Sequence, residues 1–143
     1  MKLRAPRVLH GKICLPASKS ISNRMLLLRV LSGGKIALHN ISDCDDTRAM
    51  EQGVRSEELG VRSDKSQTIN VGAAGTAMRF LTAYFASTPC DVVITGTERM
   101  CHRPIGVLVE ALRSLGADIS YEGEEGFPPL HIKVILLRFR LYH

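Results

Sequence analysis

The sequence predicts an α/β fold built from repeated helix–strand units. Two observations predict it: helical segments alternate with short extended ones along the chain, and the order of these segments repeats. At 143 residues, with 45% hydrophobic and 23% charged residues, the chain is long enough for one domain with a real core. We therefore expect a folded globular protein and not a disordered chain.

The first expected unit covers residues 16–71. Its leading helix is apolar nearly all round, so we expect it to be largely buried, and Gly33-Gly34 ends it. Asp45, Asp46 and Thr47 offer caps for the second helix, which Gly60 ends. In chain order, the expected elements are a helix over Ser20–Ser32, a strand over Lys35–Asn40, a helix from Asp45 to about Leu59, a polar loop over Arg62–Gln67 and an extended stretch over Thr68–Val71.

The second expected unit covers residues 72–132 and repeats this order. In its second helix the apolar residues fall on one face, a proline occupies the first turn and Gly116 follows the end. In chain order, the expected elements are a helix over Gly75–Ala86, a strand over Asp91–Thr95, a helix over Pro104–Leu115, and strands over Asp118–Tyr121 and Leu130–Leu136 around a glycine-rich turn.

Matched intervals support a true repeat. Arg24 and Arg48 are 24 residues apart, and so are Arg79 and Arg103. The Leu-Gly pair at position 59 lies 35 residues after Arg24, and the pair at position 115 lies 36 residues after Arg79. Two units with a period near 55 residues are the simplest account of these intervals.

The net charge of +5 does not predict a nucleic-acid binder. The last thirteen residues carry three cations and no acid, so the excess charge lies mostly in a tail and not in a stripe across the fold. We expect neither a nucleic-acid nor a membrane partner. No apolar run approaches a membrane span, and basic Lys2 and Arg4 are not followed by the apolar core of a signal, so a cytoplasmic location is the default.

The four cysteines predict no metal or redox site. They are scattered, with no closely spaced pair among them, and we expect reduced thiols without a shared role. The five histidines show no metal spacing and are interpreted as surface or structural residues. We therefore expect no metal and no cofactor.

The segment Pro16–Arg24 carries the sharpest chemical signal. Ser18 and Ser20 stand at the start of a helix, Lys19 stands at the same positive helix end, and Arg24 lies one turn further. Hydroxyl, ammonium and guanidinium groups beside free amide groups suit phosphate or carboxylate ligands. The alternative is a serine-capped helix with solvated basic residues.

Two later segments offer similar chemistry. Around Gly75 the small residues let a ligand approach the backbone closely, Thr76 can cap the helix, and Arg79 takes the place of Arg24. Arg103 directly precedes the proline that starts a helix. A cation beside this positive helix end is favourable when the cation and the helix end share an anionic ligand. The alternative for the glycine segment is an ordinary glycine turn entering a helix.

These three segments resemble the 5-enolpyruvylshikimate-3-phosphate synthase family. The family's motifs read close to LPGSKSxSNR, NAGTAMRPL and RMxxRPIGxLVxAL. Here they stand as LPASKSISNR from Leu15, AAGTAMRFL from Ala73 and RMCHRPIGVLVEAL from Arg99. The resemblance covers about residues 11 to 132, and Ala73 and Phe80 stand where the family has Asn and Pro.

The resemblance implies a partial enolpyruvyl transferase of aromatic amino-acid biosynthesis. The family transfers an enolpyruvyl group from phosphoenolpyruvate to shikimate 3-phosphate in the path to chorismate. By resemblance, Lys19 would contact both substrates, Ser20 and Arg24 would hold shikimate 3-phosphate, and Gly75 and Arg103 would hold phosphoenolpyruvate. Arg79 and Thr76 would support them.

The same resemblance implies that parts of the enzyme lie outside this chain. The family fold has three repeats in each of two domains, so two of the three repeats of the first domain are expected here. We therefore expect no catalytic residue in this chain and no activity of the chain alone. Residues 1–15 would hold a strand belonging to the second domain, and residues 133–143 do not resemble the family. A non-catalytic anion-binding module and a basic-tail binder of polyanions or nucleic acid are the alternatives.

Overall fold

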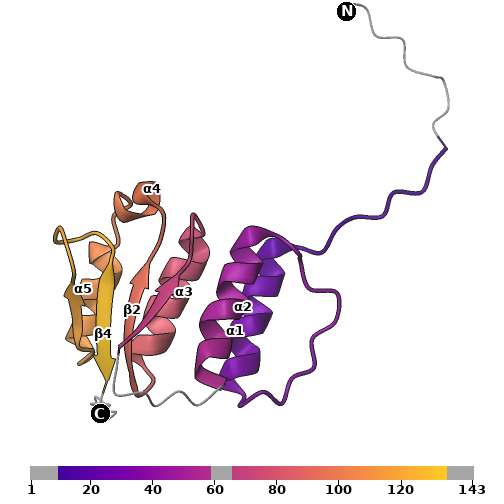
Figure 1. Cartoon of the computed structure of the whole chain (residues 1–143). Helices are drawn as coiled ribbons and strands as arrows, with labels where there is room; N and C mark the ends of the chain where they lie inside the picture. Colours follow the sequence, from indigo (N-terminus) through magenta and orange to yellow (C-terminus); the bar gives the residue numbers. More distant parts are fainter. Residues whose placement is uncertain (1–9, 59–65, 135–143) are drawn as a thin grey trace, which may run out of the picture.

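The computed structural model describes residues 10–58 and 66–134 of the chain, and Figure 1 shows their arrangement. The helices and strands are α1 (Lys19–Leu31), α2 (Asp45–Glu58), β1 (Gln67–Asn70), α3 (Gly75–Ala86), β2 (Cys90–Thr95), α4 (Glu98–Cys101), α5 (Gly106–Ser114), β3 (Ile119–Tyr121) and β4 (Leu130–Val134). Helices and the strands of one sheet are interspersed along the chain, which confirms the predicted α/β class.

The four described strands form one mixed sheet in the order β1-β2-β4-β3. Strands β1 and β2 are parallel, with Ile69 opposite Ile94, and α3 is the crossover helix between them. Strand β4 is antiparallel to both of its neighbours, with Ile132 opposite Val92 on one side and Ile119 on the other. The carboxyl end of β1 therefore leads directly into the amino end of α3.

Helix α3 is the centre of the fold. It packs against β2 and β4 on one side and against α2 and α1 on the other, so it lies between the sheet and the first two helices (Figure 1). Met78, Leu81 and Phe85 on this helix are almost fully buried, together with Ile94 and Ile132 of the sheet. This core fixes the direction of α3 and hence the place of its amino end.

The predicted strand over Lys35–Asn40 is wrong, because these residues form no strand. Strand β1, at one edge of the sheet, pairs with β2 alone, so Lys35–Asn40 does not join this sheet as a further strand. Asn40 also has a positive φ of 54°, which breaks an extended run. Alternating apolar and polar residues, without a neighbouring strand to pair with, do not form a strand here.

The predicted burial of the first helix is also wrong. Helix α1 buries Ser22, Asn23 and Leu26, but Ile21, Leu28 and Leu31 are 63%, 49% and 60% exposed. The helix packs against α2 and α3, and no other described element covers its opposite side. Apolar side chains all round a helix indicate burial only when neighbours surround it.

The helix predicted over Pro104–Leu115 begins later, at Gly106. The short helix α4 precedes it and was not predicted, and Arg103 N closes α4 by donating to Met100 O at 3.0 Å. Pro104 therefore lies between two helices and not in a first turn. Gly116, with a φ of 98°, follows the end of α5 as predicted.

The two ends of the described chain can be compared with the predicted segments 1–15 and 133–143. Residues 10–15 are exposed and form no strand, while residues 1–9 lie outside the described residues. Lys133 and Val134 belong to β4, so the fold continues two residues into the segment that sequence analysis set apart. Leu59-Gly60, residues 62–65, and Ile135 and Leu136 of the last predicted strand lie outside the described residues.

Candidate anion-binding site

A hollow of about 380 Å³ opens where the amino ends of three helices, α1, α2 and α3, meet the turn between α4 and α5. Five of the seven predicted site residues line it. The residues lining it are Lys19, Asp46, Ala73, Gly75, Thr76, Arg79 and Arg103. Residues more than 80 positions apart in the sequence thus share one concave surface.

The two helix ends at the hollow differ in their caps. Ser18 caps α1 as predicted, because Ile21 N donates to Ser18 Oγ at 3.4 Å, and Lys19 is the first residue of that helix. Thr76 does not cap α3: the cap residue is Ala74, which has no hydroxyl to offer. Among the described residues, no side chain caps the amide groups of the first turn of α3, which suits an anionic ligand.

Gly75 lets two guanidinium groups approach the backbone at the start of α3. A Cβ atom at this position would lie 2.8 Å from Arg103 Nη1 and 3.4 Å from Arg79 Nη1. Arg79 is held in place, since Nη1 donates to Gly75 O at 3.1 Å and Nη2 donates to Pro104 O at 3.2 Å. A side chain at position 75 would therefore displace these guanidinium groups, which is a steric reason for glycine at this position.

The hollow carries more positive than negative charge. Lys19, Arg79 and Arg103 face one acid, Asp46, whose Oδ2 lies 3.3 Å from Lys19 Nζ. Within the described residues, the guanidinium of Arg103 has neither an ion pair nor a hydrogen-bond acceptor. An anion entering the hollow would meet cations whose charge is only partly neutralised.

Asp46 is the member of the site that sequence reasoning missed. The acidic pair at the start of the second helix was interpreted as a cap alone. Its position in the first turn of α2 gave no indication that α2 lies beside the start of α1. Only the packing of α1 against α2 brings this carboxylate to Lys19.

Ser20 and Arg24 do not line the hollow. Arg24 Nη1 donates to Ser20 O at 2.9 Å and also to Ser20 Oγ, so the two side chains are paired on the first turns of α1. The Arg24 guanidinium carbon lies 5.7 Å from the centre of the Phe80 ring on α3. Both residues therefore lie where α1 and α3 adjoin.

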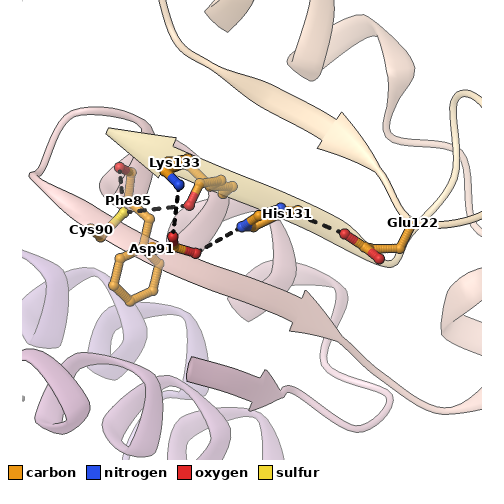
Figure 2. Close-up of polar contacts among 7 residues, drawn as sticks. Phe85, Cys90, Asp91, Glu122, His131 and Lys133 are labelled. Carbon is orange, nitrogen blue, oxygen red and sulfur yellow. Dashed lines mark hydrogen bonds and ion pairs between the residues drawn. The ribbon is translucent and has the colours of Figure 1, made fainter. Parts of the chain in front are cut away.

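A second polar cluster lies on the sheet and shares no residue with the lining of the hollow (Figure 2). His131 Nε2 lies 2.8 Å from Asp91 Oδ1, and Lys133 Nζ lies 3.4 Å from Asp91 Oδ2. The hydrogen bond with His131, with support from Lys133, lowers the pKa of Asp91. Glu122 Oε1 lies 3.6 Å from His131 Nδ1. This cluster ties β2, β4 and the end of β3 together.

The described residues hold no group of three or more metal-ligating side chains. No described helix has the length and apolarity that crossing a membrane requires.

Sequence comparison points to one family. The family described as EPSP synthase (3-phosphoshikimate 1-carboxyvinyltransferase) matches residues 3–141, which takes in most of the segment after residue 132. A protein named 3-phosphoshikimate 1-carboxyvinyltransferase from Bacteroides fragilis is 53% identical over 131 residues, covering 92% of this chain and 30% of the relative. One of the same name from Cupriavidus taiwanensis is 44% identical, covering 90% and 33%.

Structure comparison agrees. The solved structure of EPSP synthase from Acinetobacter baumannii superposes with a TM-score of 0.69 at 27% identity. The superposition covers 86% of this chain and 32% of that protein. The chain thus spans about a third of the length of the relatives that it matches.

Proposed function

The chain belongs to the EPSP synthase (3-phosphoshikimate 1-carboxyvinyltransferase) family, and on that premise we propose that its hollow is one part of the enzyme's substrate cleft. The observation that carries the proposal is the meeting of Lys19, Arg79 and Arg103 with the uncapped amino end of α3 around one hollow. Both substrates of the family are small polyanions, for which such a surface is suited.

The proposed roles follow the substrates' charges. Lys19 contacts both substrates, while Arg103 and the backbone at Gly75 hold phosphoenolpyruvate within the hollow. Ser20 and Arg24 hold shikimate 3-phosphate beside it. Arg79 and Thr76 support these contacts, and the two carbonyl bonds of Arg79 suit a residue that fixes the shape of the site.

The reaction in this proposal is enolpyruvyl transfer. The oxygen of the 5-hydroxyl of shikimate 3-phosphate forms a bond to C2 of the enolpyruvyl group, and the bond from C2 to the phosphate oxygen breaks. Inorganic phosphate leaves and, in the overall balance, carries the proton that the hydroxyl loses. This chain supplies substrate contacts, and the groups that move protons belong to parts of the family's sequence that it does not contain. We propose that the chain alone is inactive, because one side of a closed cleft cannot stabilise the transition state.

A cytoplasmic location stays a prediction.

The proposed partner is the remaining portion of the enzyme. The outer side of α1 exposes Ile21, Leu28 and Leu31. Next to it, a hollow of about 320 Å³ is lined in part by Ile21, Met25 and Leu38. An apolar surface of this kind is suited to packing against further protein.

A titration of the 143-residue chain with shikimate 3-phosphate, followed by NMR, tests the proposed binding. We expect shifts at Lys19, Ser20 and Arg24 with a dissociation constant on the order of millimolar, since half of the contacts are absent. Lys19→Ala should abolish the effect. Lys35→Ala, which removes an exposed lysine far from the hollow, should leave it intact.

Three outcomes would contradict the proposal. If shikimate, which lacks the phosphate, bound equally well, the phosphate would have no part in recognition. Shifts confined to residues 133–143 would favour a basic-tail polyanion binder. Phosphate release from the two substrates above a protein-free blank would show that the chain alone is active. Selective binding without release is the expected result.

A further inference from the structure

Phe80 connects the central helix to the arginine that does not line the hollow. It follows Arg79 on α3, and its ring is half-buried and packs against the hydrophobic core. The guanidinium carbon of Arg24, on α1, lies 5.7 Å from the centre of that ring. This separation is within the range in which an aromatic face attracts a cation.

The remaining contacts of Arg24 leave most of its donors free. Nη1 donates to the carbonyl and hydroxyl oxygens of Ser20. In the described parts of the chain, Nη2 and Nε donate to no acceptor, and no carboxylate pairs with the guanidinium. The ring therefore orients a cation without neutralising its charge or using its N–H groups, whereas a carboxylate would do both.

We propose that Phe80 is a positioning residue that holds the Arg24 guanidinium ready to donate hydrogen bonds to an anionic group of shikimate 3-phosphate. The inference rests on the proposed function of the chain. The contact is particular to this sequence, because a proline, which the family motif carries at this place, has no aromatic face. It adds a residue from the second unit to a contact otherwise made by the first.

The test compares Phe80→Leu, which keeps an apolar side chain without an aromatic face, with Phe80→Tyr, which restores the ring. In the leucine variant we expect shikimate 3-phosphate to bind about two- to five-fold more weakly, as the strength of an exposed cation–π contact implies. Phosphoenolpyruvate should bind unchanged, because Arg24 does not line the hollow. The tyrosine variant should recover the original affinity.

A second readout requires no ligand. In the free protein, the Arg24 Nε–H resonance should carry a ring-current shift that Phe80→Leu removes and Phe80→Tyr retains. In an Arg24→Gln background, Phe80→Leu should cause no further loss of affinity, since the ring acts through the guanidinium. Thermal unfolding of each variant checks that the fold is kept.

The inference is overturned if Phe80→Leu leaves both the affinity and the Arg24 resonance unchanged. Equal weakening of shikimate 3-phosphate and phosphoenolpyruvate would also overturn it, because that would indicate a general distortion of α3. If the unsubstituted chain fails to bind shikimate 3-phosphate, both this inference and the proposed function fail. If the unsubstituted chain binds shikimate 3-phosphate but Phe80→Leu does not change that binding, this inference fails and the proposed function stands.

Discussion

Arg48 and Arg103 lie at the same interval, 24 residues, after Arg24 and Arg79, yet their charges have different surroundings. Arg48 Nη2 lies 2.7 Å from Asp43 Oδ1, and this carboxylate raises the pKa of Arg48. Arg103 lies against Gly75 in the hollow without a described ion pair. The two arginines share a sequence interval, but their neighbours decide which one remains available to a ligand.

The leading helices of the two units differ in a related way. Arg24 and Arg79 each donate to the carbonyl four residues earlier, at 2.9 Å and 3.1 Å, so their local geometry is the same. Helix α3, however, has neighbours on several sides, whereas one side of α1 is uncovered within the described structure. Residues of α1 and α2, such as Leu26 and Met50, share one hydrophobic core with α3, but the apolar residues on the outer side of α1 lie outside it.

The largest expected effect contrasts the two helices through matched leucine truncations. Leu81 on α3 is fully buried, so Leu81→Ala should lower the free energy of unfolding by about 2–5 kcal/mol. Leu31 on α1 is 60% exposed, and Leu31→Ala should change it by less than about 0.5 kcal/mol. Urea unfolding measures both. A large loss in the Leu31 variant would indicate that another molecule covers α1 in solution.

The next effect contrasts the two arginines at the matched interval. Arg103→Ala should weaken phosphoenolpyruvate binding by about ten-fold or more, since a hydrogen bond to a charged group contributes about 1.5–3 kcal/mol. Arg48→Ala should leave the affinity nearly unchanged, because Asp43 already neutralises that charge. Calorimetric titration at constant salt measures both variants. Equal losses would mean that long-range charge, and not the hollow, attracts the ligand.

A smaller effect is expected from a single methyl group at the start of α3. Gly75→Ala places a Cβ atom 2.8 Å from Arg103 Nη1, which forces that side chain to move. We expect phosphoenolpyruvate affinity to fall by about five-fold, as a displaced rotamer costs about 1 kcal/mol. Gly11→Ala, with no atoms within 4 Å, is the matched control. Unchanged binding in the Gly75 variant would place the ligand away from this backbone.

The smallest effect concerns the polar cluster on the sheet. Because the pKa of Asp91 is lowered in the folded state, its ion pairs stabilise the fold above the unfolded pKa of about 3.9, and this contribution is lost as the pH falls through the folded pKa. The contribution should be below about 1 kcal/mol, since the carboxylate is 37% exposed. Urea unfolding of the original chain and of Asp91→Asn from pH 7 to pH 2 measures the difference. A difference that persists at the lowest pH would contradict it.

The sequence by itself determined the helices with strong local signals. Gly75–Ala86 was predicted with the bounds that α3 has, and Ser18 with Gly33-Gly34 delimited α1. Caps, glycines and apolar spacing act within a few residues, so they can be recognised without knowledge of the fold. The sequence motifs likewise pointed to the cationic residues of the hollow, because helix ends and basic side chains occur together in them.

The tertiary structure decided what each local segment meets. Lys35–Asn40 has the alternation of a strand but no neighbouring strand, and α1 has apolar residues on a side that nothing described covers. Asp46 reached Lys19, and Phe80 reached Arg24, through the packing of helices that are distant in sequence. Pairing, burial and charge balance depend on such non-local neighbours, and local sequence patterns carry no direct record of them.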